Sequence, residues 1–431
     1  MPNPNIIFII CDDLGYADLG CYGGSVIPTP NLDRLAQESM RFTQCYTGSP
    51  ICAPSRSVLM TGQHSGNTRV RDNFGLVGGV GDQNRVPLEP EDFTVAELLK
   101  TVGYTTGITG KWGLGEPNTT GVPTRKGFDD WFGYLNQRHA HTYYPESLWR
   151  NETRIDYPQN KDGRQSVYSH DLIVNFALDF IYRSANDPFF LYLPWTLPHG
   201  GYEIPDISPW EDQPWEENEK VYAAMVTRID NGVGQIVGLL QELGIKDNTL
   251  LFFGSDHGAA RRWKPFNSCG PLRGSKGDMY EGGMRTPMIV HWPGHIPANQ
   301  VSDQIWYYAD FLPTVADIVG VDPPENIDGV SILPTLRGEE QNLSDRFLYW
   351  ERHAGGGFKQ AARWQNWKAV RPPTERLLDE PLELYNLAED IGETTNIADQ
   401  HPDLIKKFET YMASTRTDSP NWPIGIKNFH G

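Results

Sequence analysis

The 431-residue sequence has no long hydrophobic run and no recognisable leader. No apolar stretch approaches the roughly 20 residues that would cross a bilayer. The first residues lack the basic region, apolar stretch and small-residue cleavage site of a secretory signal. We therefore expect a soluble chain without a membrane span. The sequence does not decide the cellular compartment, because a chain whose leader has been removed would have the same features.

The sequence also lacks paired cysteines and an excess of positive charge. Its formal net charge is -18, which argues against general binding to nucleic acids or anionic membranes. An anionic substrate must therefore meet a local basic pocket. The five cysteines lack the spacing of a zinc site and the density of a disulfide scaffold. They are Cys11, Cys21, Cys45, Cys52 and Cys269.

Strand and helix patterns alternate over most of the chain, which predicts an α/β fold with a mostly parallel sheet covered by helices on both faces. The apolar run at 5–10 is typical of a strand buried on both faces. Thr94 and Glu97 form a capping-box pattern at the start of a helix that Gly103 ends. Further helices are predicted at 29–39, 169–183 and 217–243, and further strands at 104–111, 188–195, 248–256 and 286–292.

The pattern changes beyond Arg337. Segments 346–353, 359–371 and 381–387 indicate hairpin strands, and 401–414 indicates a closing helix. We therefore predict a large domain over residues 1–337 and a smaller α+β domain with a small antiparallel sheet over residues 338–431.

Polar residues follow four of the predicted strands. Taken singly, adjacent aspartates are most often a turn, and a lone histidine or lysine a surface residue. Ligands of open α/β sheets, however, bind beyond the carboxyl ends of the strands, where these residues would meet. Carboxylates with one imidazole suit Ca²⁺ or Mg²⁺ better than zinc. The residues are Asp12 and Asp13, Lys111, His199, and Asp256 with His257.

Cys52 begins a short predicted helix in the stretch "ICAPSRSVLMTG", with Pro54 in its first turn and Gly62 as its stop. The amide groups and dipole at a helix start favour negative charge. A thiolate nucleophile would want a histidine base, and none stands out nearby in the sequence. A small buried core cysteine is the alternative interpretation.

These motifs resemble those of the type I, formylglycine-dependent sulfatases of the alkaline phosphatase superfamily. The resemblance spans almost the whole chain, including "LYNLAEDIGETTNIA" near its end. The matching stretches are "DDLGYADLGCYGG" from Asp12, "TPNLDRLA" from Thr29, "CAPSR" at 52–56, "GITGKWGLG" from Gly107, "LPH" at 197–199, "SDHG" at 255–258 and "GSKGDMYEGGMRTPMIVHWPG" from Gly274.

The resemblance implies an alkaline phosphatase-like fold and a sulfatase in which Cys52 is oxidised to formylglycine, whose hydrate attacks the sulfate ester. A hydrated aldehyde can afterwards expel sulfate by breaking its own C–O bond, which a serine ester could not do. The resemblance implies a bound Ca²⁺ ion, with Mg²⁺ less favoured. Its ligands would be Asp12, Asp13, the modified Cys52, Asp256 and His257. At position 257, many members of the family have asparagine in place of histidine. Arg56 would brace the nucleophile and the metal ligands, and Lys111 and Lys276 would bind sulfate oxygens. His199 would protonate the leaving group or lie beside it.

The chain departs from the family at Gly113, where a histidine is common and is credited with breakdown of the sulfated intermediate. We expect the segment "NQRHAHTYYP" to supply a replacement, with His141 favoured over His139. The alternative, that both histidines contact substrate hydroxyls or line a loop, stays open.

The same segment has the composition of a carbohydrate subsite, with Arg138, His139 and His141 beside the aromatic residues Tyr143, Tyr144 and Trp149. The alternative for the aromatic residues is core packing. A basic stretch at 261–264, "RRWK", is interpreted either as a docking patch for a polyanionic sugar or as a solvated loop.

We therefore predict a sulfuric ester hydrolase acting on a sulfated small molecule or glycan. A maturation enzyme that generates formylglycine would act on the segment 52–56. The resemblance implies a periplasmic or secreted location, with the cytoplasm as the alternative. The rival functions are a phosphodiester or phosphonate monoester hydrolase of the same superfamily, and a catalytically silent protein that binds sulfated glycans.

Overall fold

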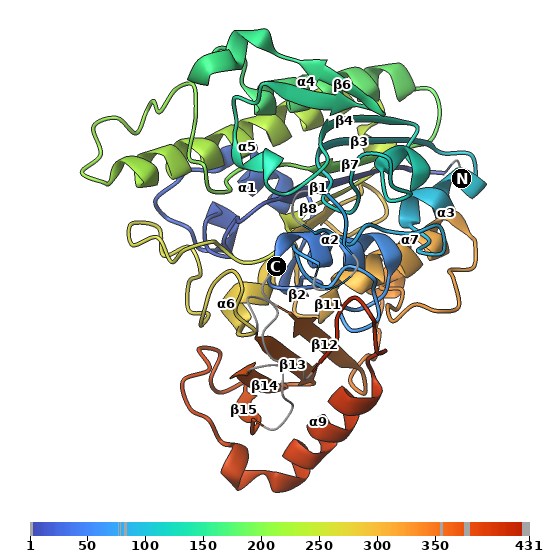
Figure 1. The fold of residues 1–431 in the computed structure, drawn as a ribbon, viewed down its shortest axis with the longest axis vertical. Helices are drawn as coiled ribbons and strands as arrows, with labels where there is room; N and C mark the ends of the chain where they lie inside the picture. The colour runs from blue at the N-terminus through green and yellow to red at the C-terminus, as the bar shows by residue number, and fades with distance from the viewer. Residues whose placement is uncertain are drawn as a thin grey trace.

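A large mixed sheet runs through the upper part of the molecule, and a small second sheet lies below it (Figure 1). This computed structural model describes residues 3–75, 77, 79–81, 84–353, 357–374 and 380–424. Parts of the predicted C-terminal domain, including residues 425–431, lie outside the described residues.

The strands of the large sheet lie in the order β10-β2-β9-β8-β1-β7-β3-β4-β5-β6, with β11 beside β2. The strands β8, β1, β7, β3 and β4 are parallel to one another, whereas β9, β5 and β6 each run antiparallel to a neighbour. The predicted mixed, mostly parallel sheet is confirmed. Its strands are β1 (Asn5–Cys11), β2 (Met40–Tyr46), β3 (Thr105–Lys111), β4 (Asp130–Tyr134), β5 (Ser147–Arg150), β6 (Thr153–Asp156), β7 (Phe189–Pro194), β8 (Thr249–Ser255), β9 (Arg285–His291), β10 (Gln300–Ser302) and β11 (Trp306–Tyr307).

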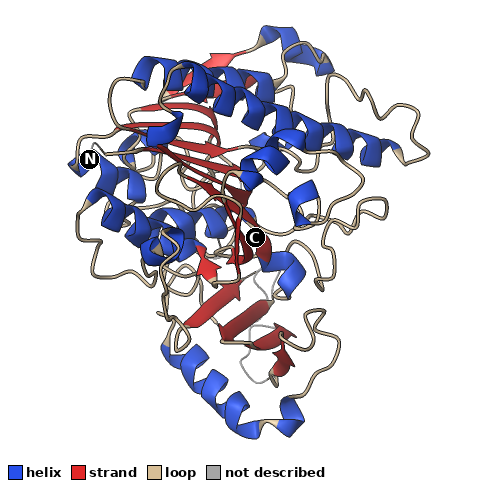
Figure 2. Ribbon diagram, turned by 180° about the vertical axis from the view of Figure 1, so that it is seen from behind, coloured by secondary structure: helices blue, strands red, loops and turns tan. Residues whose placement is uncertain are grey.

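Helices cover both faces of this sheet (Figure 2). The predicted capping box is present, because the Thr94 hydroxyl accepts a hydrogen bond from the Glu97 amide while the Glu97 carboxylate accepts one from the Thr94 amide. The helices are α1 (Pro30–Gln37), α2 (Cys52–Thr61), α3 (Val95–Thr101), α4 (Ser169–Ser184), α5 (Glu217–Glu242), α6 (Glu281–Met284), α7 (Phe311–Val319), α8 (Leu333–Leu336) and α9 (Pro402–Ser414). No helix in the described part of the chain is long and apolar enough to span a bilayer.

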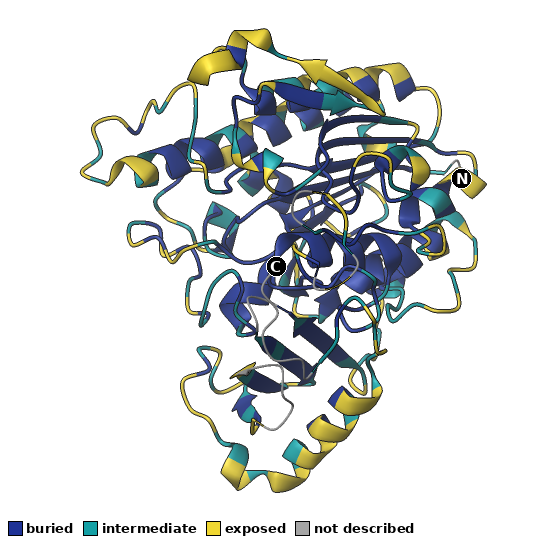
Figure 3. Ribbon diagram, viewed as in Figure 1, coloured by how far each residue is buried: buried dark blue, intermediate teal, exposed yellow. Residues whose placement is uncertain are grey.

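Strand β1 shows why its sequence is apolar throughout. Successive side chains of a strand point to opposite faces. Phe8 faces the core beneath α2 and α7, where its ring meets that of Phe311 at a centroid distance of 4.7 Å. Ile7 and Ile9 face the core beneath α4 and α5. Figure 3 shows these strands buried between the helices, whereas the outer surfaces of α5 and α9 are exposed.

The second sheet is antiparallel and has the order β12-β13-β14-β15, as predicted for the end of the chain. Helix α9 packs against it through Phe408 and Met412. Its strands are β12 (Phe347–Arg352), β13 (Phe358–Trp364), β14 (Trp367–Thr374) and β15 (Glu383–Asn386).

A buried ionic cluster joins the two sheets. The ammonium of Lys368, in β14, lies 2.9 Å from carboxylate oxygens of both Glu281, in α6, and Glu393. Burial raises the pKa of Glu393 to about 7, an effect that Lys368 opposes and the charge of Glu281 reinforces. The buried ion pair of Lys368 and Glu281 therefore links β14 to α6, the short helix that leads into β9 of the large sheet.

Candidate active site

The polar residues that follow separate strands meet at one edge of the large sheet. Strand β1 lies between β7 and β8 in parallel register, with Ile10 opposite Pro194 and Cys11 opposite Ser255. The carboxyl ends of these strands therefore stop at the same level. The convergence expected from the rule for open α/β sheets is observed.

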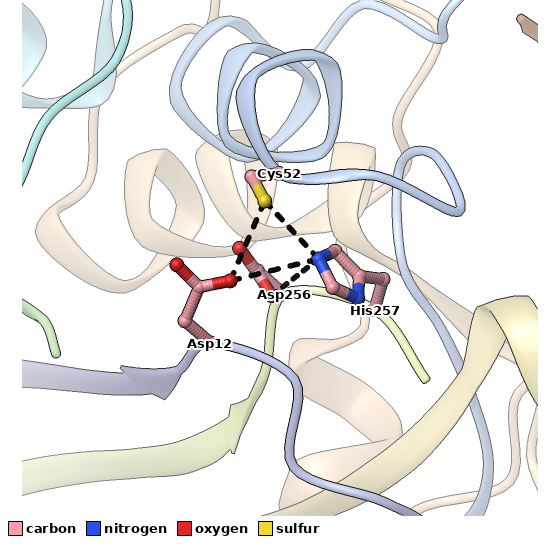
Figure 4. Close-up of side chains that lie close together, drawn as sticks. All are labelled: Asp12, Cys52, Asp256 and His257. Atoms are coloured by element: carbon pink, nitrogen blue, oxygen red, sulfur yellow. Dashed lines mark hydrogen bonds and ion pairs between the residues drawn. The ribbon is translucent and has the colours of Figure 1, made fainter. Parts of the chain in front are cut away.

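Four buried side chains form a compact donor set (Figure 4). The thiol of Cys52 lies 3.4 Å from Oδ1 of Asp12 and 3.3 Å from Nε2 of His257. The same imidazole nitrogen lies 3.2 Å from Oδ1 of Asp256. That carboxylate oxygen is buried and accepts no hydrogen bond from any residue that the structure describes. Buried polar atoms are almost always partnered, so an unpartnered carboxylate oxygen in an acidic cluster fits a bound cation.

Asp13 extends this set. Its Oδ1 lies 3.3 Å from His257 Nε2, and its Oδ2 lies 3.8 Å from His199 Nε2. Its backbone has φ of +75°, a conformation that costs a non-glycine residue free energy and that is retained mainly at functional sites. The five predicted metal-binding positions therefore lie together, and their oxygen-rich chemistry fits a hard divalent cation.

Three cations offset the charge of the carboxylates. Lys111 Nζ lies 2.5 Å from Asp12, and Lys276 Nζ lies 2.6 Å from Asp13. Arg56 is fully buried and donates to Asp256 at 2.9 Å and to the carbonyl oxygen of Lys111. Burial alone would raise the pKa of Asp12, but Lys111 and the neighbouring cations hold it well below its usual range.

The electrostatics of the site also act on its cations. Burial would lower the pKa of His257, but the charges of Asp256 and Cys52 raise it to about 9. Burial likewise opposes the charge on Lys276, but Asp13 raises its pKa above the ordinary value. A divalent cation at this point would take over the role of these positive charges toward the carboxylates.

Cys52 is the first residue of α2, as its sequence context predicted. All ten residues of this helix are buried, and Cys52 itself is 1% exposed. Gly62 ends the helix with φ of +71°, the left-handed conformation that glycine adopts most readily. The amide of Ala53 at the helix start donates to the side chain of Asn73 at 2.9 Å. Asn73 was not predicted, because no local sequence signal marks this contact.

Two of the predicted histidines lie against each other beside the side chains that are predicted to bind the metal. His199 is 8% exposed and its Nδ1 lies 2.9 Å from the carbonyl oxygen of Gly200, which directs Nε2 toward Asp13. The ring of His141 stacks on that of His199 with a centroid distance of 4.5 Å. His141 is exposed, but desolvation of its ring by the residues around it, together with the positive charges of His199 and Lys111, lowers its pKa to about 4.

The other residues of the expected carbohydrate subsite have different settings. Arg138 is exposed, and the ring of His139 packs edge-on against Tyr134 at 5.0 Å. Tyr143 and Tyr144 are buried in the core, so for these two residues the alternative of core packing is observed and a contact with sugar is not supported. The reason is tertiary packing, which the aromatic composition of a segment does not reveal.

Tyr143 has a supporting role instead. Its hydroxyl lies 2.8 Å from the carbonyl oxygen of Thr196 and 2.9 Å from that of His199. It therefore holds the loop that carries His199. The partly buried Trp149 lies in β5, toward the edge of the large sheet.

The residues of the basic stretch at 261–264 have two different settings. Arg261 and Lys264 are exposed, and the guanidinium of Arg261 lies 5.4 Å from the ring centroid of Trp263. Arg262 donates to the carbonyl oxygens of Leu272 and Gly270 and so braces the loop that leads to Lys276. The stretch thus contains both a structural arginine and exposed cations.

Buried carboxylates and cations thus meet the start of a buried helix at the strand ends of a mixed sheet. The family model described as "Sulfatase" matches residues 4–321, so the chain belongs to the sulfatase family and is a sulfuric ester hydrolase. A second model, described as "N-sulphoglucosamine sulphohydrolase, C-terminal", matches residues 275–418.

The chain is 36% identical over 382 residues to the N-acetylgalactosamine-6-sulfatase of Canis lupus familiaris, covering 81% of this chain and 68% of the relative. Among solved structures, Ps i-CgsB in complex with k-i-k-neocarrahexaose has a TM-score of 0.84 and 30% identity, covering 97% of this chain and 94% of that one. The phosphonate monoester hydrolase of Agrobacterium radiobacter shares the fold at 20% identity, with a TM-score of 0.69 over 96% of this chain and 95% of that one.

Proposed function

We propose that the protein removes sulfate from a sulfated carbohydrate, using a formylglycine made from Cys52 and a Ca²⁺ ion. The observation that carries the proposal is the meeting of Cys52 with Asp12, Asp256 and His257 within one buried cluster. Asp13 completes the set of side chains that would hold the ion. A divalent cation there would stabilise the negative charge that develops on the sulfate oxygens and the nucleophile.

The oxidised Cys52 would present a hydroxyl group as the nucleophile at the start of α2. Arg56 is placed to orient it, because its buried guanidinium is fixed by Asp256 and the Lys111 carbonyl. Lys111 and Lys276 approach from two sides and would bind the sulfate oxygens. Their ammonium groups would then exchange part of their contact with the aspartates for contact with the substrate.

His199 is the proposed proton donor to the departing alcohol. Its Nε2 faces the site while Nδ1 is held by the backbone of Gly200. His141, stacked on its ring, is the proposed base for the release of sulfate, in the absence of a side chain at Gly113. The lowered pKa of His141 keeps it neutral near pH 7, the state in which an imidazole accepts a proton.

The proposed substrate is a sulfated carbohydrate. A relative with 36% identity is named N-acetylgalactosamine-6-sulfatase. A solved structure with 30% identity is described as a complex with k-i-k-neocarrahexaose. Exposed cations, Arg138, Arg261 and Lys264, would draw a polyanionic sugar to this acidic protein. His139, partly exposed near the same loop, is proposed to contact substrate hydroxyls.

Three wider predictions accompany this function. We propose that residues 1–337 form the catalytic domain and 338–431 the C-terminal subdomain. The segment 52–56 is proposed as the recognition site of a formylglycine-generating enzyme. A periplasmic or secreted location stays a prediction.

The proposal is tested by measuring the mass of the peptide that contains Cys52 together with turnover of an aryl sulfate. Conversion exchanges H₂S for one oxygen atom in the peptide mass. We expect converted protein to hydrolyse the aryl sulfate, Cys52→Ala to lose more than about a thousandfold in rate, and Cys21→Ser, a partly buried cysteine elsewhere, to retain activity.

Three outcomes would contradict the proposal. Sulfate release by fully unconverted protein would exclude the formylglycine. Fully converted protein that binds sulfated glycan without hydrolysing it would favour a silent binding protein. A matched aryl phosphodiester should react more slowly than the sulfate; the reverse order would favour a phosphodiester or phosphonate monoester hydrolase.

A further inference from the structure

The side chain of Gln137 is buried against Gly113, two residues beyond Lys111, and its polar atoms have no partner in the part of the chain that the structure describes. The residue is 3% exposed. Neither Nε2 nor Oε1 has a hydrogen-bond partner among the residues that the structure describes. An unpartnered buried amide costs free energy, so a protein retains one where a ligand will satisfy it or where stability is given up for function.

The amide occupies the space that a side chain at position 113 would need. A Cβ atom built on Gly113 would come within 2.2 Å of Gln137 Nε2. Gly113 also has φ of +84°, so the backbone there favours glycine. Position 113 thus has no side chain of its own, and the amide of Gln137 occupies the space where one would lie.

The two segments run together toward the site. The amide of Trp112 donates to the carbonyl oxygen of Tyr134 at 2.9 Å, and that of Gly113 to Leu135 at 2.8 Å. Two residues before Gly113, the ammonium of Lys111 contacts Asp12. Gln137 is therefore held beside the strand end that carries a proposed sulfate-binding lysine.

The rest of this loop is firmly anchored. Asn136 donates to Glu116 at 3.3 Å and accepts from the His139 amide at 2.9 Å. Four residues after Gln137, the ring of His141 stacks on His199. Because its neighbours are held on both sides, Gln137 is fixed in place rather than free to turn to solvent.

We propose that Gln137 is a substrate-binding residue, whose Nε2 donates a hydrogen bond to an oxygen of the sulfate group bound by Lys111. This inference deepens the proposed function and rests on it for the identity of the ligand. An amide donor suits this place, because it binds a sulfate oxygen without a charge or a proton to lose. Proton transfer stays with His141 and His199.

Replacement by methionine separates this role from a structural one. Met has nearly the same shape as Gln and no polar amide, so Gln137→Met should leave the melting temperature equal to or above that of the wild type. We expect kcat/KM for an aryl sulfate to fall about 10- to 100-fold and inhibition by inorganic sulfate to weaken by about 10-fold. Gln137→Glu, which places a carboxylate against the sulfate, should lose at least as much.

A second buried amide provides the control. Asn160 is 2% exposed, and its side chain bonds to the backbone of Pro145, Ser166 and Val167. Asn160→Leu should lower the melting temperature by several degrees and leave kcat/KM unchanged. If Gln137→Met were destabilised but had normal kcat/KM, like Asn160→Leu, the inference would be overturned. Unchanged kcat/KM and unchanged inhibition by sulfate would also overturn it, whatever the melting temperature of the variant.

Binding of inorganic sulfate to Cys52→Ala, measured by calorimetry with and without Gln137→Met, needs no turnover. Weaker binding in the double variant supports the role of Gln137 even where the formylglycine mechanism fails. Equal binding overturns it even where that mechanism holds.

Discussion

The Nε2 atom of His257 lies 3.3 Å from the Sγ atom of Cys52, although 205 positions separate the two residues in the chain. The start of a helix and the end of a strand supply them. The contact exists because β8 pairs in parallel with β1 and stops at its level, while α2 is buried against the same edge. The proposed nucleophile and the proposed metal ligands thus depend on the same packing.

Removal of the metal should abolish activity and lower stability. Chelation of Ca²⁺ is expected to stop aryl sulfate hydrolysis, and added Ca²⁺ to restore it. An ion at about 100 times its Kd should stabilise the folded state by about 2.7 kcal/mol, which a thermal melt would detect.

His257→Leu should abolish this Ca²⁺-dependent rise in melting temperature, and the conservative His257→Asn should retain part of it. His401→Asn, a change next to Trp367 in the C-terminal region, is the control. A melting temperature of the wild type that does not respond to any divalent cation would contradict the metal site.

His199→Asn should affect substrates according to their leaving group. A proton donor is needed for an alkoxide but hardly for a nitrophenolate. We expect kcat/KM to fall about 100-fold or more for a sugar sulfate and by less than about 10-fold for 4-nitrophenyl sulfate. Steady-state rates with both substrates measure this difference. Equal losses for the two would indicate that His199 positions the sulfate group and does not act as the acid.

His141→Ala should slow the release of sulfate more than the release of the alcohol. With 4-nitrophenyl sulfate, a rapid first turnover of nitrophenol is then expected before a slow steady state, which stopped-flow absorbance would record. His139→Ala, whose ring packs on Tyr134, should show no such burst. Unchanged sulfate release in His141→Ala would remove this role.

The Glu393 carboxyl predicts a pH dependence of stability. Its pKa is about 7 in the folded protein, above its ordinary value, so the folded state holds a proton that the unfolded state has released. The free energy of unfolding should therefore decrease as pH rises from about 4.5 to 7 because of this group. Glu393→Gln should flatten that slope and stabilise the protein above pH 7. Urea unfolding of both proteins across this range measures the effect, and an unchanged slope in Glu393→Gln would contradict it.

The sequence predicted those parts of the fold that have local signals. The apolar run of β1 and the capping box before α3 each set one element, and both are observed. Strands β2, β4, β5 and β6 carry no such signal. In β2, for example, polar Arg41, Thr43 and Gln44 interrupt the apolar residues, and its pairing with β9 is fixed only by tertiary contacts.

The site residues also divide into those that the sequence predicts and those that only tertiary contacts bring together. Asp12, Asp13, Asp256 and His257 could be placed because the ends of parallel strands meet by rule. Lys276 lies in an irregular loop, and only the family resemblance pointed to it. Gln137 has no sequence signal at all, since its closeness to Gly113 arises from two segments that pair in space.

If the proposed formylglycine is made from Cys52, the complete burial of α2 implies an order of events. In the folded chain Cys52 is enclosed, so a modifying enzyme could not reach the thiol unless this part of the domain opened. We therefore expect conversion to take place before α2 is packed into the domain, and a chain that has folded with its thiol intact to resist conversion.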